Sequence, residues 1–473
     1  MDPTPRLICW SELYREAELY RAALRVYTKP LFLWRKALSR STDQQTLYDF
    51  ARHGLRNLES LQRALEEERF HFRPGLALDR NWNGKHRTLY VYPWEERIVD
   101  LLLYRLLNRR LEKWFSPHSY AYRSRAFGLD TCQHRIARAL AEAKGAPAYV
   151  VKRDIADYFP SLDHAILRAQ LGRLVEPGDY LGRLLDERVH FPYEREGAVL
   201  RAGHGIPFGA AISCLFANIY LTEMDRALCA LPGLHYFRYA DDLLAFSSSR
   251  QTALRAAQLM DHELARLHLV SKPSHHCQLL FAERGEPDAC FLPATRFRPL
   301  GLEFRAGGSV GLSRDKFRKI LNLYRYAFRR QARKFRQLRD PIKRAQLAVA
   351  LARRTLEQGV RNVAIVDYYL RHVEDEGQLR LVDRWLAEEV LHLALGNGHR
   401  RGHFRVLSFR ELRAMGLPSL VHRRRLIRHR RIESPFFVWK QYQSVRASKG
   451  TAARPRAAAA FSSLPEAAAA KAS

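Results

Sequence analysis

The stretch YFRYADDLLAFS, residues 236–247, constrains the fold of this chain more than any other stretch. Two adjacent acids, Asp241 and Asp242, stand between two runs rich in aromatic and aliphatic residues. Such runs on either side of a short polar step predict two β-strands joined by a tight turn. Asp is a favoured turn residue, so the acidic pair taken alone is better explained as turn chemistry.

A third acid, Asp154, closes AYVVKRDI (148–155), a short apolar stretch that predicts a buried strand. Side chains at strand ends can converge at one edge of a sheet, where three carboxylates repel one another unless cations lie among them. Mg²⁺ takes oxygen ligands from a few carboxylates and substrate phosphates, and two such ions can activate a hydroxyl and stabilise a leaving pyrophosphate. Together, the three acids favour nucleotidyl transfer.

The charge of the chain points to a polyanionic partner. Its 473 residues hold 80 Lys and Arg against 49 Asp and Glu, a formal net charge of +31. Lys and Arg bind phosphates by displacing counterions, so nucleic acid is the favoured partner. An anionic membrane surface is the rival, but no apolar run approaches the ~20 residues that a membrane-spanning helix needs. The start MDPTPRLICW lacks a secretory pattern, so we expect a cytoplasmic protein without a membrane partner.

The cysteines give little support to a zinc site. Six cysteines are scattered without a CxxC pair, which is typical of reduced thiols in the cytoplasm. His275, His276 and Cys277 adjoin, but no second ligand cluster follows at zinc spacing.

Hydrophobic periodicity predicts a mixed α+β chain. The predicted helices cover segments within 6–70 and residues 94–115, 164–174, 209–228, 315–346 and 379–395. The predicted strands are 148–155, a pair on either side of Asn83-Gly84, and the two halves of 236–247. Ser41 or Asp43 is the expected cap of a helix, and SFRE (408–411) has the capping-box pattern. From about residue 447 the Ala/Ser-rich composition predicts a disordered tail.

Seven segments, taken in order over roughly residues 80–312, resemble the motifs of bacterial reverse transcriptases. YADD resembles the signature turn of that family, and VVKRDIADYFPSLDH resembles the motif with the first catalytic Asp. The other five are GKHRTLYVYPWEERIVDLLLYRLL, FSPHSYAYRSRAFG, GIPFGAAISCLFANIYLTEMD, LHLVSKPSHHCQL and FRPLGLEFRAGGSVGLS. The resemblance points to the group II intron, retron, diversity-generating and phage-defence types, here as a stand-alone enzyme.

The resemblance implies a right-hand polymerase fold with fingers, a palm built on an antiparallel sheet, and a helical thumb. The implied divisions are an N-terminal helical region (1–75), fingers (76–147), palm (148–312, with a fingers insertion at about 160–205), a basic helical thumb and C-terminal region (313–446), and the tail (447–473).

The resemblance also implies roles at the catalytic centre. Asp154, Asp241 and Asp242 match the metal-binding triad, and the carbonyl of Ile155 matches a further ligand. The implied cofactor is a pair of Mg²⁺ ions, with Mn²⁺ as a substitute. Phe159 matches an aromatic residue that lies beneath the incoming sugar and excludes a 2′ hydroxyl, which argues against an RNA-directed RNA polymerase. Ordinary core packing is the rival explanation for this aromatic residue.

Nucleotide contacts are implied at three further places. Lys85 and Arg87 match basic fingers residues that hold the triphosphate, although a solvated basic turn would look the same. Phe208 and Gly209 lie in the nucleotide-pocket loop, where many relatives carry Gln instead of Phe. Lys272 matches a candidate proton donor to pyrophosphate.

The residues that follow the nucleotide-pocket loop agree only in part with the family pattern. Ser213 is kept in the pocket motif, whereas Cys214 replaces the Pro of many relatives, which argues against a typical group II intron enzyme. Asn218 follows the family pattern in the next helix.

Primer and template contacts are implied toward the C-terminus. Leu300, Gly301 and Leu302 match the hairpin that holds the primer end, where Gly permits close backbone approach. The basic residues expected to contact nucleic acid are Arg318, Lys319, Arg325, Arg329 and Arg330 in 315–346, and Arg423, Arg424 and Arg425 in HRRRLIRHRR. A solvated helix face is the alternative for both segments.

The chain shows no HNH-like endonuclease pattern, no CxxC zinc finger and no second set of spaced acids like that of ribonuclease H. We therefore expect a polymerase that copies a dedicated, structured noncoding RNA into DNA from dNTPs, in phage defence or a retron-like system, with an oligomer compatible with the sequence. Two alternatives stay open: an untemplated or protein-primed DNA polymerase on the same fold, and a non-catalytic, maturase-like RNA-binding protein.

Overall fold

The computed structural model describes residues 7–30, 33–82, 85–124, 127–142, 147–176, 178–273, 277–284, 286, 288–357, 366, 369–396 and 400–429. These residues divide into two compact units. The first contains the described parts of Met1–Cys132 and Tyr149–Gln278, and the second contains those of Gln133–Ala148 and Leu279–Thr451. Each unit is described by itself.

The first unit holds the N-terminal helices and two sheets. Its elements are α1 (Trp10–Leu13), α2 (Glu16–Thr28), α3 (Leu33–Leu38), α4 (Leu47–Arg52), α5 (Gly54–Glu66), β1 (Gly75–Trp82), β2 (Lys85–Val91), α6 (Trp94–Arg110), β3 (Ala148–Asp154), α8 (His164–Leu171), α9 (Tyr180–Val189), β4 (Pro192–Arg195), β5 (Ala198–Arg201), α10 (Ser213–Cys229), β6 (His235–Tyr239), β7 (Asp242–Ser247) and α11 (Arg250–Arg266). The unit boundary falls within α7 (Leu129–Glu142), at the start of β3 and within β8 (Cys277–Phe281).

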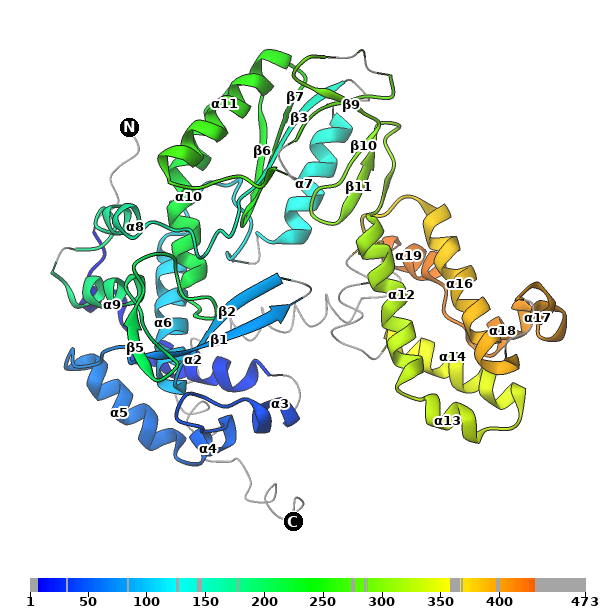
Figure 1. Ribbon diagram of the computed structural model, residues 1–473, viewed down its shortest axis with the longest axis horizontal. Helices are drawn as coiled ribbons and strands as arrows, with labels where there is room; N and C mark the ends of the chain where they lie inside the picture. The colour runs from blue at the N-terminus through cyan, green and yellow to red at the C-terminus, as the bar shows by residue number, and fades with distance from the viewer. Residues whose placement is uncertain are drawn as a thin grey trace. The chain divides into compact units, whose positions relative to one another are not determined.

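Strands β6, β7 and β3 lie side by side in this order, and both pairings are antiparallel. The predicted hairpin over residues 236–247 is therefore confirmed, with β7 in the middle of the three strands. Helix α10 packs against β6, and α11 packs against β7 (Figure 1). Five of the six residues of β7, Leu243 to Ser247, are buried, as expected for a strand in the middle of a sheet.

A second sheet has the strand order β2-β1-β4-β5. Its β1–β2 hairpin pairs Trp82 with Lys85, which confirms the predicted pair of strands. The turn residues Asn83 and Gly84 lie outside the described residues.

Apolar periodicity located the helices of the first unit well, but not their ends. Leu58, Leu61 and Leu65 form the buried face of α5, as their spacing predicts. The predicted helices at 164–174 and 209–228 are α8, which ends at Leu171, and α10, which begins at Ser213.

The expected cap at Ser41 or Asp43 is wrong. These two residues hydrogen-bond to each other within a turn, and the helix α4 begins later. Its cap is Thr46, whose hydroxyl accepts a hydrogen bond from the amide of Asp49, while the Asp49 carboxylate accepts one from the amide of Thr46. A complete capping box at the first helical turn satisfies amides that Ser41 is too far back in the chain to reach.

The second unit combines a small antiparallel sheet with helices. Its elements are most of α7, β9 (Leu292–Ala294), β10 (Arg296–Phe297), β11 (Leu302–Arg305), β12 (Val310–Leu312), α12 (Arg314–Arg329), α13 (Ala332–Gln337), α14 (Pro341–Glu357), α16 (Glu376–Leu395), α17 (Arg400–Val406), α18 (Phe409–Ala414) and α19 (Leu420–Arg428). The sheet has the order β10-β11-β12, and α14 and α16 pack together and against α12.

One long predicted helix of the second unit is broken. Residues 315–346 form α12, α13 and the start of α14 instead of one helix. The helix stops where Gln331 leaves helical geometry and again where Leu338 becomes extended. Pro341 then opens α14, where its missing amide hydrogen costs nothing. The capping box of SFRE is confirmed, with Ser408 capping α18, whereas the predicted tail from residue 447 lies outside the described residues.

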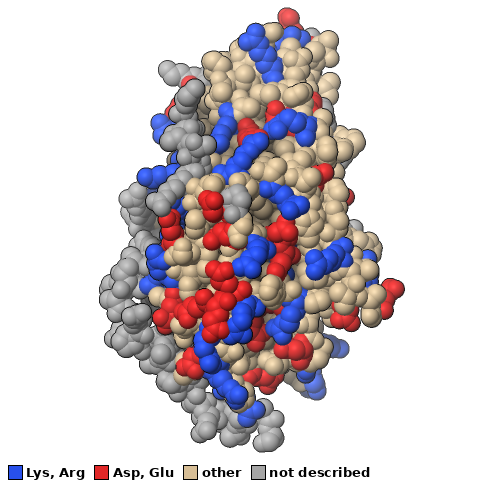
Figure 2. Space-filling model, turned by 90° about the vertical axis from the view of Figure 1, so that its left-hand side faces the viewer, with Lys and Arg blue, Asp and Glu red and all other residues tan. Residues whose placement is uncertain are grey.

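No helix among the described residues is both long enough and apolar enough to cross a membrane. Figure 2 shows a face on which acidic side chains gather among basic ones. Contacts with a polyanion would therefore depend on where the arginines and lysines lie and not only on their number.

Three fully buried arginines in the first unit are each paired with a carboxylate: Arg153 with Asp261, Arg188 with Asp100, and Arg238 with Asp225.

The pair on α9 and α6 carries an additional acid. Both Arg188–Asp100 hydrogen bonds are 2.9 Å long, and the buried Glu96 lies 3.6 Å from the same guanidinium. Glu96 also accepts hydrogen bonds from the amide and Nε of Arg73. Burial nevertheless raises the pKa of Glu96 to about 7, against the opposing effects of Arg188 and Arg73.

This raised pKa predicts a pH dependence of stability. Between the ordinary pKa near 4.5 and the folded pKa near 7, the folded protein holds a proton on Glu96 that the unfolded chain releases. Its stabilising effect is present below the ordinary value and is lost as pH rises through about 7. Glu96→Gln should therefore gain free energy of unfolding relative to wild type as pH rises from 5 to 8.5, by up to roughly 3 kcal/mol.

Urea unfolding at several pH values measures this difference. Glu95→Gln is the matched control, because Glu95 is only partly buried and contacts the same Arg73. Parallel pH profiles for wild type and Glu96→Gln would contradict the prediction.

Candidate active site

The acidic turn between β6 and β7 has only two residues outside the strands. Tyr239 pairs with Asp242 across the hairpin, so Ala240 and Asp241 form the loop. Ala240 has φ +58°, a left-handed conformation that glycine adopts far more readily than alanine. The turn that presents Asp241 and Asp242 is therefore strained, which is a property found at functional sites.

Strand register brings the third acid to this turn. Asp154, the last residue of β3, lies directly opposite Asp242, the first residue of β7. The amide of Ile155 donates a 3.1 Å hydrogen bond to the carbonyl of Asp241, which ties the end of β3 to the turn. The structure thus brings Asp154, Ile155, Asp241 and Asp242 together, as predicted from the sequence.

Two lysines accompany the carboxylates. Lys272 forms an ion pair with Asp154, and its amide donates a 2.7 Å hydrogen bond to the Asp154 carbonyl. Lys152 Nζ lies 3.5 Å from Asp242 Oδ1. Both cations reduce the repulsion between acids that the sheet forces together.

Asp242 is still incompletely compensated. Its Oδ1 is buried without a hydrogen-bond partner, and the Lys152 ammonium lies 3.5 Å from it. Burial, together with the neighbouring Asp154 and Asp241, raises the pKa of Asp242 to about 6, against the opposing effect of Lys152. An oxygen of this kind is a suitable ligand for a metal ion.

The donor set suits Mg²⁺, which prefers carboxylate and carbonyl oxygens. Within the described ranges, no three or more His, Cys, Asp or Glu side chains already surround a common point where an ion could bind. This is compatible with Mg²⁺, because proteins usually hold it through one or two carboxylates together with substrate phosphates. Asp154 and Asp242, with its unpartnered Oδ1, therefore fit the ion. For the ion to bind Asp154, the Lys272 ammonium would have to move away from that carboxylate.

Aromatic rings continue the site on the side of the nucleotide-pocket loop. The Phe159 and Phe208 rings meet edge to face at 6.0 Å, and Tyr122 contacts Phe159 at 6.2 Å. The guanidinium of Arg87, on β2, lies 5.3 Å from the centre of the Phe208 ring. Phe159, Phe208 and Arg87 were each predicted to bind the nucleotide, and the structure brings them into one row. Lys85 lies at the start of the same strand.

The pocket loop is held in place by its backbone. The amide of Ile206 donates to the Phe159 carbonyl at 2.9 Å, and the amide of Tyr90 donates to the Phe208 carbonyl at 3.0 Å. Gly209 has φ +119°, and a Cβ there would lie 2.8 Å from the Leu89 side chain and 3.0 Å from the Tyr90 carbonyl oxygen. Glycine is therefore required for the close approach of this loop to β2.

The remaining predicted contacts belong to the second unit. Gly301 has φ +84° between Leu300 and the first residue of β11, Leu302, and Gln133 holds the Leu300 carbonyl at 2.8 Å. The α12 residues predicted to contact nucleic acid, Arg318, Lys319, Arg325, Arg329 and the following Arg330, are all exposed.

In α19 the predicted arginines differ from one another. Arg424 is buried and bonds to the Val373 carbonyl and Glu376, Arg425 pairs with Glu376, and Arg423 is half-buried. Their contact with nucleic acid stays a prediction.

Sequence reasoning missed two residues of the site, Lys152 and Tyr122. Lys152 precedes Asp154 by two positions on the same strand, so strand alternation alone would have placed it on the same face. Tyr122 lies in a segment that resembles the family, but its contact with Phe159 depends on tertiary packing.

Comparison with known proteins shows which family part of this chain resembles. The family model described as "Reverse transcriptase (RNA-dependent DNA polymerase)" matches residues 83–304. This range contains the acidic turn, Asp154 and the aromatic row. Over these residues the chain is similar to reverse transcriptases, and the predicted fold class, an α+β right-hand polymerase, is confirmed.

The chain is also similar to individual proteins over shorter ranges. It is 27% identical over 149 residues to Protein YkfC of Escherichia coli strain K12, which covers 31% of this chain and 38% of that protein. It is 25% identical over 171 residues to an uncharacterised 91 kDa protein in the cob intron of Schizosaccharomyces pombe, which covers 36% of this chain and 20% of that protein. The chain thus spans well under half the length of either curated relative.

Among solved structures, apo telomerase of Candida tropicalis, truncated from its C-terminal domain, gives a TM-score of 0.39 at 12% identity. The match covers 58% of this chain and 63% of that chain.

The facing carboxylates predict a conflict between stability and function. Asp242→Asn removes one of the charges that the sheet forces together and should raise the free energy of unfolding of the metal-free protein by about 1 kcal/mol. Added Mg²⁺ should stabilise wild type more than this variant, because the variant loses a ligand. Thermal unfolding with and without Mg²⁺ tests both statements, with Asp157→Asn as a control on an exposed neighbouring acid. An Asp242→Asn variant that is less stable than wild type without metal would refute the repulsion argument.

Proposed function

We propose that this chain is an RNA-directed DNA polymerase that makes cDNA by metal-dependent nucleotidyl transfer. The observation that carries the proposal is the register of Asp154 opposite Asp242, next to Asp241, inside a domain that matches the reverse transcriptase family. A protein that only binds RNA has no use for converging anions beside a polyanion.

The metal would be held by Asp154, Asp241 and Asp242, with the Ile155 carbonyl as a further ligand. We propose two Mg²⁺ ions, replaceable by Mn²⁺. When bound, such ions lower the pKa of an attacking hydroxyl and stabilise the charge of a leaving pyrophosphate. The carboxylates would hold the ions, and the hairpin turn, with Ala240 in a left-handed conformation, presents Asp241 and Asp242. Lys272, released from Asp154, would be able to donate a proton to the departing pyrophosphate.

Nucleotide selection is assigned to the aromatic row. Phe159, braced by Tyr122 on one side and Phe208 on the other, would lie under the incoming sugar and exclude a 2′ hydroxyl. Arg87 over the Phe208 ring would bind the triphosphate by charge-assisted hydrogen bonds, with Lys85 nearby on the same strand. The Phe208 ring thus supports the gate and the phosphate-binding arginine at once.

Template and primer contacts are assigned to the second unit. The exposed cations of α12 form a face suited to a phosphate backbone, while its apolar residues Ile320, Leu321, Tyr324 and Phe328 are buried. Leu300, Gly301 and Leu302 would hold the primer end. We further propose that the template is a dedicated, structured noncoding RNA and that the enzyme works in the cytoplasm, in phage defence or a retron-like system. Sequencing nucleic acid that copurifies with the protein would identify the template and the product.

Two alternative functions share parts of this site. An untemplated or protein-primed DNA polymerase would use the same acids, and it would be recognised by product that is independent of added RNA or attached to the protein. A non-catalytic, maturase-like protein would bind RNA without incorporating nucleotides.

The carboxylate assignment makes a direct prediction for activity. Asp241→Asn combined with Asp242→Asn should reduce incorporation of dNTPs at least about 100-fold, because electrostatic stabilisation of the transition state is lost. Primer extension with the native RNA and Mg²⁺ measures the loss, and Asp157→Asn serves as the control. Synthesis by the double variant at the rate of wild type, or no DNA synthesis by wild type, would refute the proposed function.

The gate assignment makes a separate prediction. Phe159→Ala should raise the relative use of NTPs by at least about tenfold, measured as the ratio of kcat/KM for NTP and dNTP. Tyr158→Phe, a change in the preceding buried aromatic residue, is the control, because its ring is kept and only its hydrogen bond to the Ala217 carbonyl is lost. If wild type already uses NTPs as well as dNTPs, Phe159 is no gate.

A further inference from the structure

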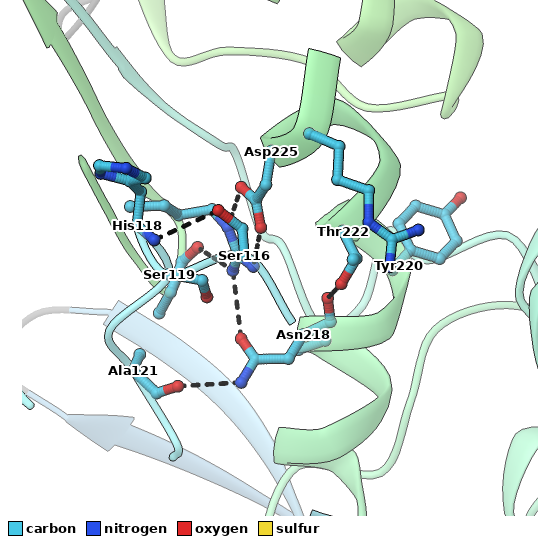
Figure 3. Close-up of polar contacts among 12 residues, drawn as sticks. Ser116, His118, Ser119, Ala121, Asn218, Tyr220, Thr222 and Asp225 are labelled. Atoms are coloured by element: carbon cyan, nitrogen blue, oxygen red, sulfur yellow. Dashed lines mark hydrogen bonds and ion pairs between the residues drawn. The ribbon is translucent and has the colours of Figure 1, made fainter. Parts of the chain in front are cut away.

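A buried polar network lies directly behind the catalytic turn, and neither the metal site nor the nucleotide pocket uses it. Arg238, on β6, is fully buried, as are Asp225 and Asn218 on α10. The guanidinium of Arg238 donates to both oxygens of Asp225, at 2.7 and 2.6 Å, and to Asn218 Oδ1 at 3.2 Å. Figure 3 shows Asn218 and Asp225 on the side of α10 that faces the segment from Ser116 to Ala121.

The backbone of Arg238 is fixed by the same segment. Its amide donates to the His118 carbonyl at 2.9 Å, and its carbonyl accepts from the amide of Tyr120 at 2.9 Å. Asn218 Nδ2 completes the connection with a 2.9 Å hydrogen bond to the Ala121 carbonyl (Figure 3). Strand β6, helix α10 and the segment 116–121 are thus joined through one residue, and the side-chain bonds of Arg238 and Asn218 are buried.

The network reaches the turn itself. Arg238 Nη1 also donates to the carbonyl of Ala240, at 3.4 Å. Ala240 is the residue with φ +58°, a left-handed conformation that is unfavourable for an L-amino acid other than glycine. This is the longest of the Arg238 hydrogen bonds, but the bidentate pair with Asp225 fixes the guanidinium plane and therefore the direction of this bond.

Stability alone is a poor explanation for this arrangement. Desolvation makes a buried ion pair little better than a well-packed apolar pair, and often worse. Burial disfavours the charged guanidinium, yet Asp225 raises the pKa of Arg238 above its ordinary value, so the charge is retained. Tyr236 adds a hydrogen bond from its hydroxyl to Asp225 at 2.9 Å. The network instead fixes the orientation of the Arg238 guanidinium, which donates a hydrogen bond to the Ala240 carbonyl in the strained turn.

We propose that Arg238 is a positioning residue, which acts through the Ala240 carbonyl to hold the left-handed turn that aims Asp241 and Asp242 at the metal. The catalytic part of this inference rests on the proposed function, whereas the restraint on the turn does not. Asp225 and Asn218 orient the guanidinium, and the segment 116–121 orients the strand.

The first test measures the turn without catalysis. Arg238→Lys keeps a cation beside Asp225 but loses the fork that reaches Asn218 and Ala240. In the metal-free protein, hydrogen exchange of the turn amides, followed in peptides that cover residues 236–247, should become at least about tenfold faster. Arg188→Lys is the matched control, since it alters another fully buried arginine–carboxylate pair of the same unit that does not contact the turn. Should Arg238→Lys not fold, Asn218→Ala should give a smaller change in the same direction.

The second test separates positioning from general support of the fold. Arg238→Lys should raise the Mg²⁺ concentration for half-maximal activity at least about threefold and lower kcat, with KM for dNTP within about twofold of wild type. Ala240→Gly should reduce the effect of Arg238→Lys on both quantities, because glycine adopts the left-handed conformation without the clamp.

Unchanged exchange of the turn in Arg238→Lys, an equal change in Arg188→Lys, or an Mg²⁺ shift that Ala240→Gly does not reduce would each overturn the proposal. If wild type synthesises no DNA while the exchange of the turn responds as expected, the polymerase assignment fails and the restraint on the turn stands.

Discussion

The antiparallel register between β3 and β7 is the constraint on which the rest of the site depends. It places Asp154 directly opposite Asp242, at a separation of about 5 Å between backbones, where two carboxylates repel each other. A loop would relax from such an arrangement, but β7 pairs with both β3 and β6, and a shift of one residue would disrupt both pairings. The stability of the sheet therefore holds the two carboxylates together despite their repulsion, and Lys152 and Lys272 offset part of that repulsion.

The same logic of rigid support applies to the groups around the acids. Arg238 is joined to α10 and to the segment 116–121, and from this fixed position it donates a hydrogen bond to the carbonyl of the strained Ala240. On the other side, Phe159 lies between Tyr122 and Phe208, and Phe208 also contacts Arg87. A site whose parts are each fixed by a second set of contacts loses little freedom when substrate binds.

The sequence predicted the parts of this site that depend on local patterns. The hairpin with Asp241 and Asp242, the strand that ends at Asp154 and the capping box at Ser408 all follow from residues close together in the chain. Tertiary contacts were out of reach: the restraint by Arg238 needs residues from three separate segments. The helix cap was placed at Ser41 or Asp43 instead of Thr46 because several residues that can cap a helix lie close together there. The break of the helix before Pro341 was missed because the arginine-rich, amphipathic pattern continues through it.

The arginines show why charge counts alone do not locate a nucleic-acid surface. Arg424 belongs to a strongly basic stretch, yet its guanidinium is buried against the Val373 carbonyl and Glu376, so a phosphate contact would have to break bonds that hold α19 in place. Arg318 and Arg329 lie exposed on α12, where a phosphate can approach without such a loss. Arg153, Arg188 and Arg238 are internal and contribute nothing to the surface. The net charge of +31 therefore favours a polyanionic partner, but burial and pairing decide which cations can meet it, and they favour α12 over α19.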